Sequence, residues 1–252
     1  MLLSEWTKLR SVRSTPLSLA AAFAVAVLGG LFSATGRAKD YPTWSTVDKA
    51  AFDPVNLSFD GLAFAQLAFG VIGVLAISSE YTTGQIRTTF AVTPRRRLVL
   101  IDKAVVLGAM TLVVGEILSL VSFLVAQLGL RSVHLDVPLS DGAALRAVAG
   151  AGIYLVALTL LGLGLGAIIR HTAGAVSAVF GLVFVVPLVA TNLSGWISWP
   201  SKWNLWAAGN ALISTRPPVD GAPSPALGLL ICAVYVLVPL ALALFLVGRR
   251  DA

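Results

Sequence analysis

The segment ALGLLICAVYVLVPLALALFLV, residues 226–247, decides the fold class of this chain. It runs for 22 residues without a charged side chain. A helix of about 20 apolar residues crosses the hydrocarbon core of a bilayer, which is about 30 Å thick. A strand of a membrane barrel would instead alternate apolar and polar residues over about ten positions, and this segment does not. We therefore interpret it as a membrane-spanning helix.

Five further segments have the same character. The six predicted spans are Pro16–Ser33, Leu57–Ser78, Ala104–Leu130, Leu145–Ile169, Ala173–Thr191 and Ala226–Val247. Only 12% of the 252 residues are charged, against about 25% in a soluble domain, so a soluble surface is excluded. Because unpaired backbone amides cost several kcal/mol in lipid, the spans must be helical. The sequence predicts an all-α membrane protein with one transmembrane domain over residues 1–252.

The basic residues are divided unequally between the two sides of the predicted bundle. Eleven lie on the side of the two termini: Lys8, Arg10, Arg13, Arg87, Arg95, Arg96, Arg97, Lys103, Arg170, Arg249 and Arg250. The other side carries seven, together with seven aspartates, so its net charge is zero. Lysine and arginine are enriched in cytoplasmic loops, which predicts that both termini are cytoplasmic. Topology and anionic headgroups account for the overall charge of +6, so we expect no nucleic-acid partner.

The residues before the first span have an amphipathic pattern. Leu2, Trp6 and Leu9 follow the spacing of one helix face, which predicts a helix over residues 1–15 that lies in the membrane interface. It would serve either as a simple anchor or as a docking element. Thr15 and Pro16 suit the N-cap and the first position of the first span.

The connection between the second and third spans, SEYTTGQIRTTFAVTPRRRLVLIDK (residues 79–103), is the longest on the basic side. Tyr81, Ile86 and Phe90 are apolar groups among polar ones, and Gly84 permits a tight backbone path between them. Glu80 is expected to pair with a basic side chain of a partner protein or of the N-terminal helix. Pro94 is expected to begin the helix that carries Arg95–Arg97 into the third span. Alternatively, Ile86 and Phe90 rest on the membrane surface.

Four tryptophans lie before the last span at spacings of three, four and three residues: Trp196, Trp199, Trp203 and Trp206. This spacing predicts one aromatic face on an interfacial or re-entrant helix. Such a face is typical of an aromatic belt. A gate on the outer side of a substrate pathway is the alternative.

Motifs for chemistry are missing from the sequence. It has no GxxxxGK[ST] phosphate-binding loop. With one cysteine (Cys232, expected to be a buried apolar residue) and two distant histidines (His134 and His171), we expect no disulfide and no metal site. We expect no catalytic or cofactor-binding residue. Gly162 and Gly166 have the spacing of a close helix contact, either within the bundle or across a dimer.

Together these features resemble the ABC-2 class of ATP-binding-cassette transporter permeases. The resemblance covers the whole chain and rests on the pattern E-Y-x-x-G-x-I-x(7)-P-x-x-R-x(5)-K, matched by Glu80, Tyr81, Gly84, Ile86, Pro94, Arg97 and Lys103. The N-terminal SEWTKLRS, residues 4–11, also resembles many bacterial members. The resemblance implies a permease dimer, homo- or heteromeric, in the bacterial cytoplasmic (inner) membrane. Two copies of a separate ATPase subunit would bind ATP and Mg²⁺ and drive export. The 79–103 connection would be the coupling loop.

Two other classes of protein are alternatives to a permease, and one acidic residue is relevant to both. An ion-coupled transporter would show paired halves and several intramembrane charges, and a membrane enzyme would need a cluster of polar groups. One such acid, Glu116, lies near the middle of the third predicted span. We expect it to face the bundle interior or a wet cavity near Ser119 and Gln127. It would contact substrate or make an interhelical hydrogen bond. The remaining alternative is a stand-alone immunity or assembly protein. The apolar spans favour an amphipathic or lipid-like cargo.

Overall fold

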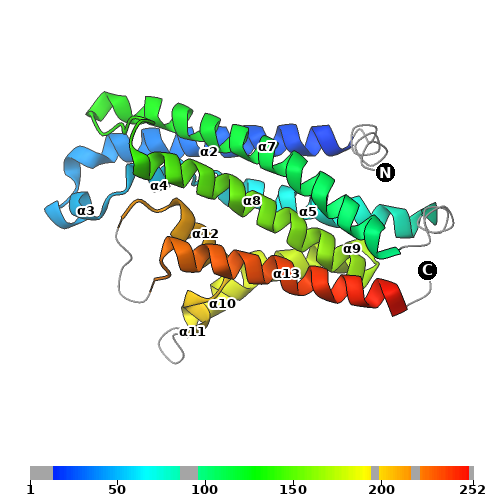
Figure 1. Ribbon diagram of the computed structural model, residues 1–252. Coiled ribbons are helices and arrows are strands. Elements are labelled where there is room, and N and C mark those ends of the chain that lie inside the picture. The colour runs from blue at the N-terminus through cyan, green and yellow to red at the C-terminus, as the bar shows by residue number, and fades with distance from the viewer. Residues whose placement is uncertain (1–13, 86–95, 194–198, 217–221, 250–252) are drawn as a thin grey trace.

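The computed structural model describes residues 14–85, 96–193, 199–216 and 222–249. All regular elements within these ranges are helices (Figure 1). They are α2 (Ser14–Asp40), η1 (Tyr41–Thr43), α3 (Thr46–Ala51), α4 (Pro54–Leu57), α5 (Leu62–Thr82), α7 (Arg96–Leu130), η2 (Arg131–Val133), α8 (Gly142–Ile169), α9 (Thr172–Phe180), η3 (Gly181–Val185), α10 (Val186–Asn192), α11 (Trp199–Lys202), α12 (Leu205–Ile213) and α13 (Pro225–Arg249).

Six helical stretches are long and apolar enough to cross a membrane, which confirms the predicted fold class. They are α2 with η1, α5, α7 with η2, α8, the continuous run α9–η3–α10, and α13. α2 begins and α13 ends at the same end of the bundle (Figure 1). We call it the basic end, because Lys103, Arg170 and Arg249 lie there, and we call the other the opposite end.

The structure corrects three boundaries at the opposite and basic ends. The second span begins at Leu62 rather than Leu57, because Asp53 caps a separate short helix, α4, through the backbone N–H groups of Val55 and Asn56. The first span continues to Asp40, seven residues beyond Ser33. Thr15 lies inside α2, whose described residues begin at Ser14, so it does not cap the helix. The predicted interfacial helix falls almost entirely on residues 1–13, outside the described residues.

The predicted 79–103 loop is shorter than expected. α5 continues to Thr82 and α7 begins at Arg96, so α7 starts eight residues before the predicted third span, or about 12 Å farther out at 1.5 Å per residue. Glu80 and Lys103 therefore lie on helices rather than in a loop. Ile86, Phe90 and Pro94 lie outside the described residues, and the role predicted for them stays a prediction.

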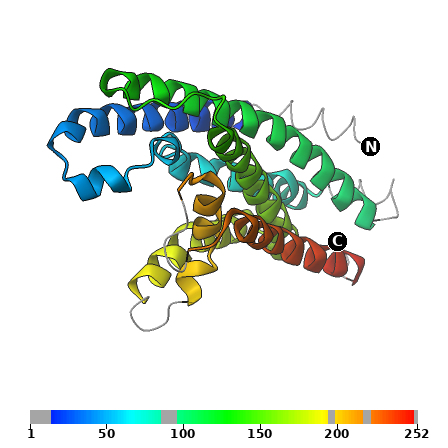
Figure 2. The ribbon, with the colours of Figure 1, turned by 60° about the vertical axis from the view of Figure 1, so that its left-hand side comes forward.

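α8 is the central helix of the bundle and the most buried of the six spans. It contacts α5, α7, α9, α12 and α13 (Figures 1 and 2). Its contact with α5 is very close, because a methyl group on Gly162 would overlap the carbonyl oxygen of Gly70. Likewise, a methyl group on Gly73 would overlap the carbonyl oxygen of Thr159. The small residues Gly162 and Gly166 therefore serve the interior of the bundle.

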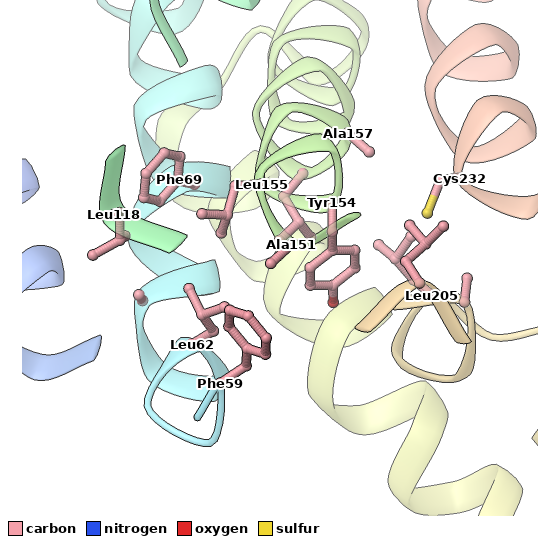
Figure 3. Packing of buried hydrophobic residues seen from close by; sticks show 14 of the residues in the cluster. Phe59, Leu62, Phe69, Leu118, Ala151, Tyr154, Leu155, Ala157, Leu205 and Cys232 are labelled. Carbon is pink, nitrogen blue, oxygen red and sulfur yellow. The ribbon is translucent and has the colours of Figure 1, made fainter. Parts of the chain in front are cut away.

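Polar side chains inside the bundle are bonded across helices. The Tyr154 hydroxyl of α8 donates to Oε1 of Gln66 in α5 at 2.7 Å. Figure 3 shows Tyr154 among Phe59, Leu62, Leu205 and Cys232, where Cys232 is buried as predicted. Because an unsatisfied polar group at this depth would cost several kcal/mol, such bonds fix which helix faces meet.

Candidate functional site

Two places in the bundle combine polar chemistry with a defined geometry. One is the basic end, where α5, α7, α8 and α9 meet. The other is the opposite end, where two cavities lie beside α2 and α4. The sequence predicts a coupling surface at the basic end.

Glu80 and Lys103 form a buried ion pair between α5 and α7. The Nζ atom of Lys103 lies 3.0 Å from Oε1 of Glu80, and each side chain is 5% exposed. The sequence did not indicate Lys103 as a partner of Glu80, because 23 residues separate the two side chains. Pairing of Glu80 with the N-terminal helix or a partner protein stays a prediction. Burying two charges is compensated only when they are paired closely, so this contact fixes the start of α7 against the end of α5.

A second contact at the basic end joins α5 to the turn between α8 and α9. The guanidinium of Arg170 lies 5.1 Å from the ring centroid of Tyr81, within the range of a cation–π interaction. Arg170 adopts a left-handed backbone conformation with φ of 58° as it closes α8. The Thr172 hydroxyl then donates to the Ser78 hydroxyl at 3.0 Å. We call Glu80, Tyr81, Lys103 and Arg170 the basic-end joint.

Two further predicted coupling residues, Gly84 and Arg97, lie at the same end of the bundle. Gly84 has φ of 72°, a left-handed conformation that glycine adopts without strain. Arg97 lies against Gly248 near the end of α13. The described residues thus bring Glu80, Tyr81, Gly84 and Arg97 to one end of the bundle.

Glu116 is half-buried on α7 and lies directly over Gly152 of α8. Its neighbours Val113 and Ile117 on α7 are more than half exposed, so Glu116 sits at the edge of the bundle rather than in its interior. Ser119 and Gln127 do not join it, since Ser119 donates to the carbonyl oxygen of Val148 and Gln127 bonds to Ser58. The interhelical hydrogen bond expected of Glu116 is not formed among the described residues.

The tryptophans before the last span do not share one helix. α11 ends at Lys202, and Asn204 begins α12 by accepting a hydrogen bond from the backbone N–H of Ala207. Asparagine is a strong N-cap residue, and this signal was available in the sequence. Trp203 and Trp206 lie on either side of this break. Trp196 lies outside the described residues, as does the side chain of Trp199.

α12 is held firmly at the opposite end. Its Leu205 and Ala208 are fully buried, and its last turn accepts two hydrogen bonds from Arg146 of α8, at the carbonyl oxygens of Leu212 (3.1 Å) and Ser214 (2.6 Å). Asp53 accepts hydrogen bonds from the backbone N–H and the hydroxyl of Thr215, both at 2.9 Å. These contacts fix the position of α12 against α8 and against Asp53.

Two adjoining cavities lie beside α2 at this end of the bundle, and α12 lines the first of them. The apolar cavity, of about 410 Å³, is lined by Phe32, Phe59, Phe64, Trp206 and Ile213 together with Gly29, Ser33, Asn56, Asp60, Gly61, Ala63 and Asn210. The acidic cavity, of about 530 Å³, is lined by Arg37, Trp44, Asp48, Ala51, Phe52, Asp53, Asn56, Leu57 and Asp60. Asn56 and Asp60 line both. Among the gate candidates, Trp206 lines the apolar cavity.

Comparison with known proteins does not identify a family for this chain, so a functional assignment depends on the residues described above. No model of a protein family matches the chain, and no curated protein is found to be related to it.

Proposed function

We propose that this chain is the membrane subunit of an ATP-driven exporter of the ABC-2 class. It would form the substrate pathway as a dimer and would receive force from separate ATPase subunits. The observation that carries the proposal is the basic-end joint, because it connects both ends of the 79–103 connection rigidly to the spans. A displacement of that connection by a partner would therefore reach α5, α7 and α8 together.

The charge distribution supports a cytoplasmic position for the basic end. The sequence assigns 11 of the 18 basic residues to the basic end, and it assigns seven basic residues and seven aspartates to the opposite end. Retention of basic residues in the cytoplasm favours this orientation. An ATPase in the cytoplasm would then meet the joint directly.

The first prediction concerns this orientation. In a Cys232→Ser background, cysteines at the exposed positions Val47 and Ser132 are expected to react with a membrane-impermeant thiol reagent in intact cells. Cysteines at Thr83 and Arg249 should react only after the membrane is opened. Labelling of all four in opened membranes is the control for accessibility, and the reverse pattern in intact cells would overturn the orientation.

The second prediction tests the proposal itself. When the chain is co-expressed with an ATP-binding-cassette ATPase encoded beside it, the two are expected to co-purify in equal amounts and to hydrolyse ATP. Arg170→Ala should weaken this assembly, because it removes the cation–π contact that supports Tyr81. Lys49→Ala at the opposite end is the matched control. A chain that is inserted and folded yet never retains the ATPase would contradict the proposal.

A further inference from the structure

The apolar and acidic cavities meet at one carboxyl group, which belongs to Asp60. This residue lies in the turn that precedes α5, outside the membrane-spanning segments. The next residue, Gly61, lies so close to α2 that a methyl group on it would overlap the carbonyl oxygen of Ala26. Gly29 and Gly61 line the apolar cavity beside this contact, and α12 lines it with Trp206, Asn210 and Ile213. The close glycine contact therefore forms part of the cavity lining.

The side of the apolar cavity is open. Phe32 on α2 and Phe64 on α5 line it, and they are 81% and 70% exposed. Both lie on predicted spans, so their exposed rings face hydrocarbon rather than water. A molecule dissolved in that leaflet would reach the cavity sideways, between α2 and α5, with its apolar part against Phe32, Phe59 and Trp206.

The charge of the acidic cavity determines which polar group such a molecule can carry. The acidic cavity carries three carboxylates, Asp48, Asp53 and Asp60, and one guanidinium, Arg37, a formal net charge of −2. Asp53 is occupied by hydrogen bonds from Thr215, and Asp48 accepts a hydrogen bond from the hydroxyl of Ser45, the N-cap residue of α3. Asp60 is the carboxylate that reaches both cavities. A phosphate would be repelled by this charge, whereas a cation would be attracted.

We propose that the two cavities form a binding site for an amphipathic cation, whose apolar body lies in the apolar cavity and whose positive group pairs with Asp60. The binding itself does not require an ATPase. That the bound cation is cargo rests on the proposed function. The site assigns to Asp60 the contact with cargo that the sequence led us to consider for Glu116.

The protonation of Asp60 gives the site a pH dependence. Desolvation raises the pKa of the Asp60 carboxyl above its ordinary value, and this outweighs a hydrogen bond from Ser33 and the charge of Arg37, which lower it. The charged groups around it are Arg37 of α2, Asp48 of α3 and Asp53 before α4, while α12 contributes the neutral Trp206 and Asn210. Protonation removes the negative charge, so binding of a permanent cation is expected to weaken as the pH falls through the raised pKa.

Binding of tetraphenylphosphonium to the purified chain in phosphatidylcholine nanodiscs, without any ATPase, tests the site. Asp60→Asn is expected to lower the affinity about tenfold, the size of one lost charged contact, and to abolish the pH dependence. Phe64→Ala should weaken binding by several-fold at every pH. Asp141→Asn, a carboxylate outside both cavities, is the matched control and should bind normally.

Three outcomes would overturn the proposal. The first is equal affinity of the Asp60→Asn and unaltered proteins. The second is equal binding of tetraphenylborate, which has the same shape and the opposite charge. The third is displacement by phosphatidylethanolamine in the disc, which would assign the cavities to a bilayer lipid. Binding without ATPase-driven transport would instead contradict only the proposed function.

Discussion

Replacing Glu80 with alanine is expected to lower the thermal stability of the purified protein markedly and to reduce its association with an ATPase. The substitution leaves Lys103 charged at a site where only 5% of its side chain is exposed. Breaking one side of a buried ion pair costs about 3–5 kcal/mol. We expect the unfolding midpoint, followed by tryptophan fluorescence in detergent, to fall by about 5 °C or more.

A paired substitution separates the structural contribution of Glu80 from direct contact with a partner. Glu80→Gln with Lys103→Met removes both charges and keeps similar side-chain volumes, so it should restore the midpoint to within a few degrees. Because the structure pairs Glu80 with Lys103, we expect this double variant to recover substrate-stimulated ATP hydrolysis as well. Recovery of stability without recovery of hydrolysis would mean that Glu80 contacts the ATPase directly. An unchanged midpoint in Glu80→Ala would contradict the buried pair.

A second large loss of stability is expected from a substitution at Gly162. A methyl group there would overlap the carbonyl oxygen of Gly70, and both atoms belong to helix backbones that cannot move aside without separating α5 from α8. Overpacking of this kind costs about 1–3 kcal/mol, and more where backbone must shift. Gly162→Ala should therefore lower the unfolding midpoint by several degrees, and Gly162→Leu should yield little folded protein in size-exclusion chromatography.

Gly36 supplies the matched control for that experiment. It lies on α2, and no atom of the described structure comes within 4 Å of the position that a methyl group would occupy. Gly36→Ala should leave the midpoint unchanged or raise it slightly, because alanine favours a helix by about 1 kcal/mol over glycine. An unchanged midpoint in Gly162→Ala would contradict the close contact between α5 and α8.

Much of the fold could be predicted from the sequence, because burial in lipid leaves one choice of secondary structure. A run such as residues 226–247 has no alternative to a helix when its amide groups cannot bond to water. The end of the fourth span at Ile169 was predicted correctly for the same reason: Arg170 is the first charged residue after the run. Two predictions were wrong because a capping residue begins a new helix: the start of the second span and the single helix that was to carry the tryptophans. Asp53 before α4 and Asn204 before α12 are such residues, and both were visible in the sequence.

The candidate sites could be identified only from the tertiary structure. The sequence by itself determined that the chain has six apolar helices, and that its basic residues gather at one end. It could not determine that Glu80 meets Lys103, that Gly162 meets Gly70, or that Asp60 lies between two cavities. These contacts join residues that lie on different helices or in the turns beside them. When a helix is apolar on all sides, its hydrophobic periodicity does not predict which of its faces contacts a neighbouring helix. Close backbone contact at glycines and the pairing of buried charges decide that choice, and both act only once the helices are packed.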